Sequence, residues 1–146
     1  MNTKIPVWFW VVSTILLIWN LVGLLAFFIQ MNLDMEALQN LPSDQRELQT
    51  ELLSNYPIWA KAGYALAVFG GFTGALLLLM KKKIARKAFI ISLIGMSVQL
   101  LYTFKFIGRS VDMYGPAAIA MPVMIFLLVF YSIWLAGFGE KKSWLA

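Results

Sequence analysis

The chain has 146 residues, of which 61% are hydrophobic and 13% are charged, and its formal net charge is +5. A soluble globular domain has about 45–50% apolar and about 25% charged residues, so this composition excludes an ordinary soluble domain and a disordered segment. The chain has no cysteine and no histidine, which excludes disulfides, thiolate nucleophiles and the commonest metal ligands. We therefore expect a small integral membrane protein with a single domain, 1–146.

Four apolar runs, separated by charged residues, predict four membrane-spanning helices. A helix needs about 20 apolar residues to cross the hydrocarbon core of a bilayer, and the runs lack the alternation typical of barrel strands. The first run is too long for a cleaved signal peptide and is expected to remain as a span. We predict an all-α fold, a four-helix transmembrane bundle with spans at about 6–31, 57–80, 88–107 and 117–139.

The basic residues predict the orientation of the bundle. Five of them lie in the loop 81–87. Lys4 precedes the first span, and Lys141 and Lys142 follow the last span. Short loops rich in lysine and arginine stay in the cytoplasm, so both termini are expected to be cytoplasmic (N-in/C-in) in a multi-pass protein of the cell inner membrane. The positive charge indicates membrane lipids, not nucleic acid, as partners. The loop 81–87 either binds anionic lipid or serves only as this topology signal.

The first outer loop, residues 32–56, predicts two short amphipathic helices at the membrane surface. Asp34 can cap the first and Ser43 the second. In the second helix Leu48 and Leu52 are four residues apart, so they lie on one apolar face. The pair is either a lid over an outward-facing cavity or a plain cover for the end of the bundle.

Polar side chains within the spans are the candidate binding residues. Asn20 lies near the middle of the first span, Tyr64 lies in the second, and Ser92, Gln99 and Tyr102 recur at helical spacing in the third. Because polar groups are costly in a bilayer, their placement carries information. The set Asn20, Gln99, Tyr102 and Tyr64 either lines a cavity that binds a neutral solute or supplies hydrogen bonds that hold the helices together.

Small residues in the second span predict close helix packing. Gly70 and Gly74 form a GxxxG motif, which lets another helix approach its backbone closely. The motif does not reveal whether the partner is another span or a second subunit. Pro122 is expected to kink the fourth span.

Catalysis, cofactors and metals are not expected. No aspartate or glutamate lies within a predicted span, which argues against an exporter driven by a membrane-embedded acid. The loop carboxylates show no paired spacing with a base, so the protein is not predicted to be an enzyme. Eight methionines without cysteine or histidine do not predict a copper site.

Several strings recur along the four predicted spans in a distinctive combination. They are Trp8-Phe9-Trp10, Trp19-Asn20-Leu21-x-Gly23, Gln30-Met31, Ala67-Val68-Phe69-Gly70-Gly71-x-x-Gly74, Ser92-Leu93-x-Gly95-x-x-Val98-Gln99, Gly115-Pro116 and Met121-Pro122. With these strings the chain resembles, over nearly its whole length, a group of small four-span bacterial inner-membrane proteins, some of which carry the label "sugar transporter". The resemblance implies transport of a sugar-like solute and implies no particular functional residues.

Two functions follow as hypotheses. In the first, the protein passively transports a small neutral, sugar-like solute as a homo-oligomer, because four helices rarely enclose a solute path alone. In the second, it is a non-transporting accessory or scaffold subunit that binds a membrane partner.

Overall fold

The computed structural model describes residues 4–32, 39–54 and 56–146. These residues are helical or irregular, and no strand occurs among them. In chain order the elements are α1 (Val7–Met31), α3 (Ser43–Ser54), α4 (Ile58–Leu79), α5 (Ala85–Thr103), the 3-10 helix η1 (Phe104–Phe106), α6 (Ile107–Tyr114) and α7 (Ala117–Lys141).

The prediction of an all-helical fold with four spans is confirmed. The four candidate spans, Val7–Met31, Ile58–Leu79, Ala85–Tyr114 and Ala117–Lys141, are long and apolar enough to cross a membrane. The third begins at Ala85, three residues before the predicted start, because the basic residues at its beginning continue the helix. It also extends further than predicted, through η1 into α6.

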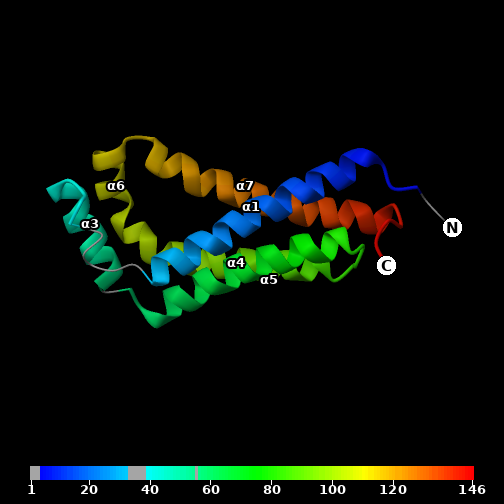
Figure 1. Cartoon of the computed structure of the whole chain (residues 1–146), viewed down its shortest axis with the longest axis horizontal. Helices are drawn as coiled ribbons and strands as arrows, with labels where there is room; N and C mark the ends of the chain where they lie inside the picture. Colours follow the sequence, from blue (N-terminus) through cyan, green and yellow to red (C-terminus); the bar gives the residue numbers. More distant parts are fainter. Residues whose placement is uncertain (1–3, 33–38, 55) are drawn as a thin grey trace.

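The four long helices pack in the order α1, α4, α5, α7. The interface between α4 and α5 is the most extensive, α1 packs on α4, and α7 packs on α5. The start of α1, the end of α7 and the α4–α5 connection lie at one end of the bundle (Figure 1). We call this the basic end, and we call the opposite end, which carries α3 and α6, the α3–α6 end.

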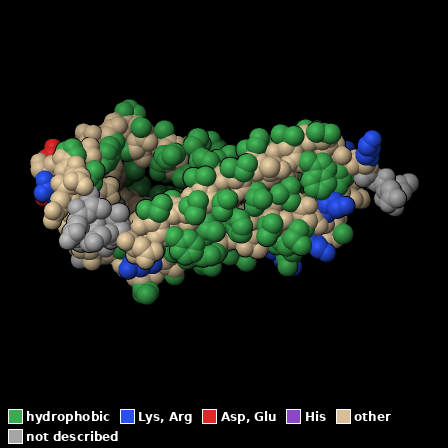
Figure 2. Space-filling view, viewed as in Figure 1, with side chains coloured by type: hydrophobic (Ala, Val, Ile, Leu, Met, Phe, Trp, Pro, Cys, Tyr) green, Lys and Arg blue, Asp and Glu red, His purple; other side chains and the backbone are tan. Residues whose placement is uncertain are grey.

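Side-chain type changes along the bundle as a membrane protein requires. Hydrophobic side chains cover the flank of the molecule, and lysine and arginine side chains gather at the basic end (Figure 2). Large apolar side chains such as Ile15, Leu101 and Leu127 are more than half exposed. In a membrane these side chains contact lipid, so their exposure has no hydrophobic cost.

Close contact between α4 and α5 depends on glycine. A Cβ atom on Gly63 would lie 2.7 Å from the carbonyl oxygen of Gly95, and one on Gly95 would lie 2.6 Å from that of Gly63. Gly70 lies against the backbone of Ser92, and Gly74 lies against the ring of Phe89. The GxxxG motif therefore packs against α5 of the same chain.

A compact apolar core closes the basic end. Phe9 of α1 and Leu135 of α7 are both fully buried there, together with Trp144 and Leu145, which follow α7. The backbone of Ala146 bonds the α4–α5 connection twice, donating to the oxygen of Lys81 (2.8 Å) and accepting from the nitrogen of Lys83 (2.9 Å). The segment after α7 thus packs against α1 and α7 and is hydrogen-bonded to the α4–α5 connection.

Short helices cover the other end. α3 begins at Ser43, the residue predicted to start it, and buries Leu48 to 1% exposure. The helix expected after Asp34 lies outside the described residues. α6 was not predicted as a separate helix; after the single turn of η1 it continues the third candidate span to Tyr114. α7 runs through Pro122, which lies inside the helix.

Candidate functional site

A cavity of about 410 Å³ lies between α1, α4, α5 and α7. Its size falls in the range of about 300–1,000 Å³ typical of small-molecule sites. Apolar side chains from α1 and α7, including Val22, Met121 and Ile125, form one side of the wall. Polar side chains come from α1, α4 and α5, namely Asn20, Tyr64, Ser92 and Gln99.

Asn20 lies in the wall of this cavity, where α1 passes α4. Its amide nitrogen donates to the carbonyl oxygen of Leu16, one turn earlier in α1, at 2.7 Å. Its amide oxygen lies against Gly71, where a Cβ atom would be only 2.1 Å away. Gly71 therefore makes the room that a polar side chain of this length needs between the two helices.

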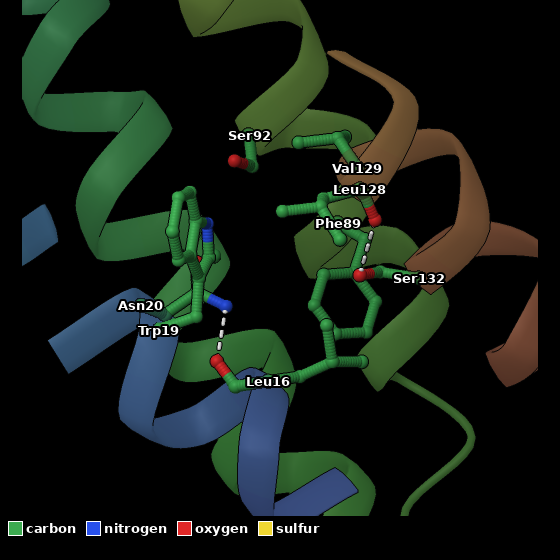
Figure 3. Close-up of a pocket in the computed structure, with 9 residues that line it drawn as sticks. Leu16, Trp19, Asn20, Phe89, Ser92, Leu128, Val129 and Ser132 are labelled. Carbon is green, nitrogen blue, oxygen red and sulfur yellow. Dashed lines mark hydrogen bonds between the residues drawn. The ribbon is translucent and has the colours of Figure 1, made fainter. Parts of the chain in front are cut away.

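A smaller compartment of about 10 Å³ adjoins the cavity and shares Asn20 and Ser92 with it. The hydroxyl of Ser92 donates to the carbonyl oxygen of Ala67 in α4 at 2.6 Å, and that of Ser132 donates to Leu128 in its own helix at 2.7 Å. Side chains from α1, α5 and α7 surround this space (Figure 3). It has the volume of about one water molecule and polar groups on several sides.

Gln99 and Tyr56 form a hydrogen bond near the α3–α6 end. The side-chain nitrogen of Gln99 donates to the hydroxyl oxygen of Tyr56 at 3.2 Å. Burial raises the pKa of the Tyr56 hydroxyl above its ordinary value, so this hydroxyl stays protonated at neutral pH. Tyr64 also lines the cavity, and its ring lies 5.1 Å from that of Phe27 in α1.

Tyr102 is not among the described residues that line the cavity. It is 4% exposed and packs in an aromatic cluster, with ring distances of 4.9 Å to Tyr56 and 5.5 Å to Phe106. The prediction grouped it with Gln99 because the two residues are three positions apart on one helical face. The structure brings together Asn20, Tyr64 and Gln99, while Tyr102, one turn further along α5, faces the chain segment that enters α4.

Several lining residues were not predicted as site residues. Trp19 and Met96 belong to the wall, and Ser92 was placed on the right helical face without a role in the site. Ser132, which lines the smaller compartment, and Tyr56, which bonds Gln99, were also not predicted. Tyr56 precedes the second predicted span, and no polar residue stands three or four positions from Ser132. Helical spacing identified the polar face of α5, but nothing in the sequence indicated which segments would face it.

The cavity wall carries no charge within the part of the chain that the structure describes. In a low-dielectric surrounding, a charged ligand would need a partner of opposite charge. The arrangement therefore suits an uncharged molecule with a small number of hydrogen-bonding groups.

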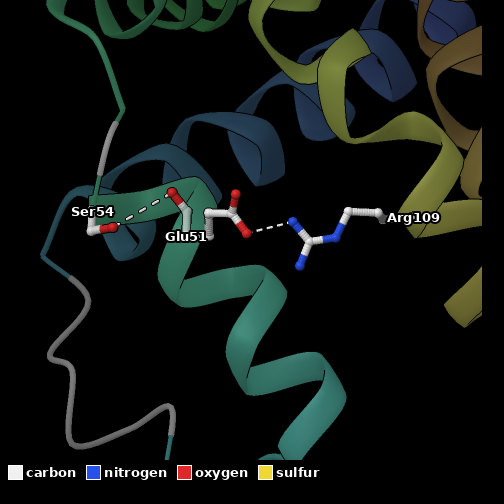
Figure 4. Close-up of polar contacts among 3 residues, drawn as sticks. All are labelled: Glu51, Ser54 and Arg109. Atoms are coloured by element: carbon white, nitrogen blue, oxygen red, sulfur yellow. Dashed lines mark hydrogen bonds and ion pairs between the residues drawn. The ribbon is translucent and has the colours of Figure 1, made fainter.

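An ion pair lies outside the cavity, where α3 meets α6. The guanidinium of Arg109 donates to a carboxylate oxygen of Glu51, and Ser54 bonds the Glu51 carbonyl (Figure 4). Both charged side chains are about half exposed. Exposed ion pairs contribute little to stability because water and salt screen them, so this one links two surface helices without supporting the cavity.

No known family model, curated protein or solved structure matches this chain.

Proposed function

We propose that this integral membrane protein takes a small uncharged molecule into the cavity between α1, α4, α5 and α7 and allows it to cross the membrane passively. The observation that carries the proposal is a cavity of about 410 Å³ at the depth of the spans, with neutral polar side chains and apolar side chains in one wall. Apolar walls with a few convergent polar groups are typical of small-molecule sites.

The setting of this activity belongs to the proposal as well. A bacterial inner membrane, cytoplasmic termini and a sugar-like solute agree with the basic loops and with the resemblance to small four-span membrane proteins. Assembly as an oligomer would need a surface other than the GxxxG motif, because Gly70 and Gly74 are occupied by α5.

Solute entry into liposomes tests the proposal. Purified protein is reconstituted, and the entry of labelled sugars and polyols is compared with that into empty vesicles. Gln99→Leu removes an amide from the wall. We expect the entry rate to fall by about twofold to twelvefold, since one hydrogen bond is worth about 0.5–1.5 kcal/mol.

Ser97→Ala is the matched control, because Ser97 is exposed on the same helix and bonds only within it, to Leu93. Its entry rate should equal that of the wild type. A wild-type rate in folded Gln99→Leu would remove Gln99 from the site. No entry of any solute through folded wild-type protein would contradict passive transport of this class.

The hydrogen bonds within the bundle favour a second candidate, an accessory or scaffold subunit. Ser92 bonds α4, and Gln99 bonds Tyr56, so these side chains also hold the helices together. For a scaffold we expect a membrane partner that co-purifies at a constant ratio and is lost when its contact surface is changed. Saturable solute entry by the isolated protein would contradict this second candidate.

A further inference from the structure

We infer that the cavity takes a neutral lipid-like alcohol, with one apolar chain and one hydroxyl group, directly from the membrane through the opening between α1 and α7. This inference rests on the proposed function: it keeps the uncharged ligand and the cavity, and it replaces the sugar-like solute with a molecule of another chemical class.

The opening follows from how α1 and α7 meet. At the basic end the two helices share a core, in which Gly139 of α7 lies against Phe9 of α1. Toward the α3–α6 end α7 departs from α1, and the surface is hollowed between them (Figures 1 and 2). Val22 on α1 and Met121 on α7 line the cavity and are nevertheless 57% and 54% exposed. These two side chains therefore form the mouth.

The mouth faces lipid. Its neighbours on the two helices, Ile18 and Leu25 on α1 and Val123 on α7, are apolar and at least half exposed. All of them lie within candidate membrane spans. A molecule that already lies among the acyl chains can enter here without passing through water.

The two sides of the cavity differ in chemistry. Val22, Met121 and Ile125 line the mouth and the α7 side, whereas the polar lining side chains are Asn20, Tyr64, Ser92 and Gln99 of α1, α4 and α5. A molecule with hydroxyl groups all around would leave several of them unpaired against the apolar side, which is unfavourable. A molecule with an apolar chain and one polar end matches both sides.

The hydrogen-bonding groups that the cavity wall still offers determine which polar group the ligand carries. Ser92 uses its hydrogen on Ala67, and Gln99 uses one amide hydrogen on Tyr56. The Ser92 hydroxyl oxygen and the Gln99 carbonyl oxygen can still accept. The second amide hydrogen of Gln99 can still donate. A ligand hydroxyl can donate and accept at once, whereas an ether or an ester can only accept. The uncharged wall excludes fatty acids and amines in their charged forms.

Binding to the full-length protein in phosphatidylcholine nanodiscs tests the inference. The probes are labelled 1-dodecanol, its methyl ether and glucose, each corrected for uptake by empty nanodiscs. We expect saturable binding of dodecanol, binding of the ether weaker by about fivefold or more, and no binding of glucose.

Two matched pairs of variants locate the site. Gln99→Leu should weaken dodecanol binding by about fivefold to tenfold and ether binding less, while Ser97→Ala changes neither. Val22→Trp should block the mouth and abolish binding of both probes. Ile15→Trp places the same ring on an exposed position of α1, two turns from Val22 and outside the cavity lining, and should bind as the wild type does. Thermal unfolding confirms that each variant is folded.

Each other outcome has a definite meaning. Equal affinity for dodecanol and its ether, or equal binding by Val22→Trp and Ile15→Trp, would overturn the inference. Saturable glucose binding without dodecanol binding would overturn it and leave the proposed function standing. Failure of the folded wild type to bind any of the three probes would contradict both.

Discussion

Three serines within the spans differ in the hydrogen bonds that they form. Ser92 bonds across to α4, Ser97 bonds its own helix, and Ser13 is fully buried with no hydrogen-bond partner among the described residues. The sequence shows three similar residues in apolar segments, and helical spacing separates only Ser92, which shares a face with Gln99. The differences arise from the residue that each serine faces, and that depends on packing.

Loss of the Ser92 hydroxyl should weaken the bundle. Ser92→Ala removes the bond to the Ala67 carbonyl and leaves that oxygen with one partner fewer, so we expect a loss of about 0.6 kcal/mol in unfolding free energy. Ser97→Ala makes the same chemical change on the lipid-facing side of α5 and should have almost no effect. Thermal or denaturant unfolding in detergent measures both. Equal stability of the two variants would show that the Ser92 bond contributes nothing.

At the scale of elements, α4 is the central helix of the bundle. Gly63, Gly70 and Gly74 lie against α5, while Gly71 accommodates Asn20 of α1. The richness of this span in small residues predicted close packing, and GxxxG identified part of the contact. The partner could not be predicted, because glycine spacing describes one surface and not the surface that meets it. The role of Gly95 depends on the mutual approach of two backbones, which no local pattern specifies.

The glycine contact between α4 and α5 should tolerate no added methyl group. In Gly95→Ala the new Cβ would lie 2.6 Å from the Gly63 oxygen, and overpacking of this kind costs about 1–3 kcal/mol. Gly108→Ala in α6 is the control, since nothing lies within 4 Å of its Cβ position, and it should be neutral or stabilising by up to about 1 kcal/mol. Unfolding midpoints measure the difference. A Gly95→Ala protein as stable as Gly108→Ala would contradict the close contact.

At the scale of the whole molecule, the basic end of the bundle is closely packed, whereas α1 and α7 separate at the α3–α6 end. Phe9, Leu135 and Trp144 close the basic end, and the last residues bond the α4–α5 connection. At the α3–α6 end α1 and α7 are apart, and the cavity lies between them. Hydropathy predicted four spans, but not this asymmetry, because pairings between distant helices depend on tertiary contacts. The position of Trp144 after the last span is typical of a residue at the membrane interface, and this residue is instead buried in the core.

The orientation of the whole molecule is open to direct chemical labelling. The chain has no native cysteine, so a single introduced cysteine can be labelled without background. The excess of basic residues at the basic end predicts that this end is cytoplasmic. In sealed right-side-out vesicles, a membrane-impermeant maleimide should react with Ser54→Cys in α3, and with Lys82→Cys only after the membrane is opened. The reverse pattern would contradict the proposed orientation.

The central claim is that an uncharged molecule occupies the cavity between α1, α4, α5 and α7. Native mass spectrometry of the protein released from nanodiscs measures this occupancy for a ligand of any identity. Met121→Trp narrows the mouth, whereas Leu127→Trp places the same ring on a 62% exposed position of the same helix outside the cavity lining. We predict a neutral adduct on the wild type and on Leu127→Trp that is lost from Met121→Trp. An adduct retained equally by Met121→Trp, or none on the folded wild type, would contradict the account.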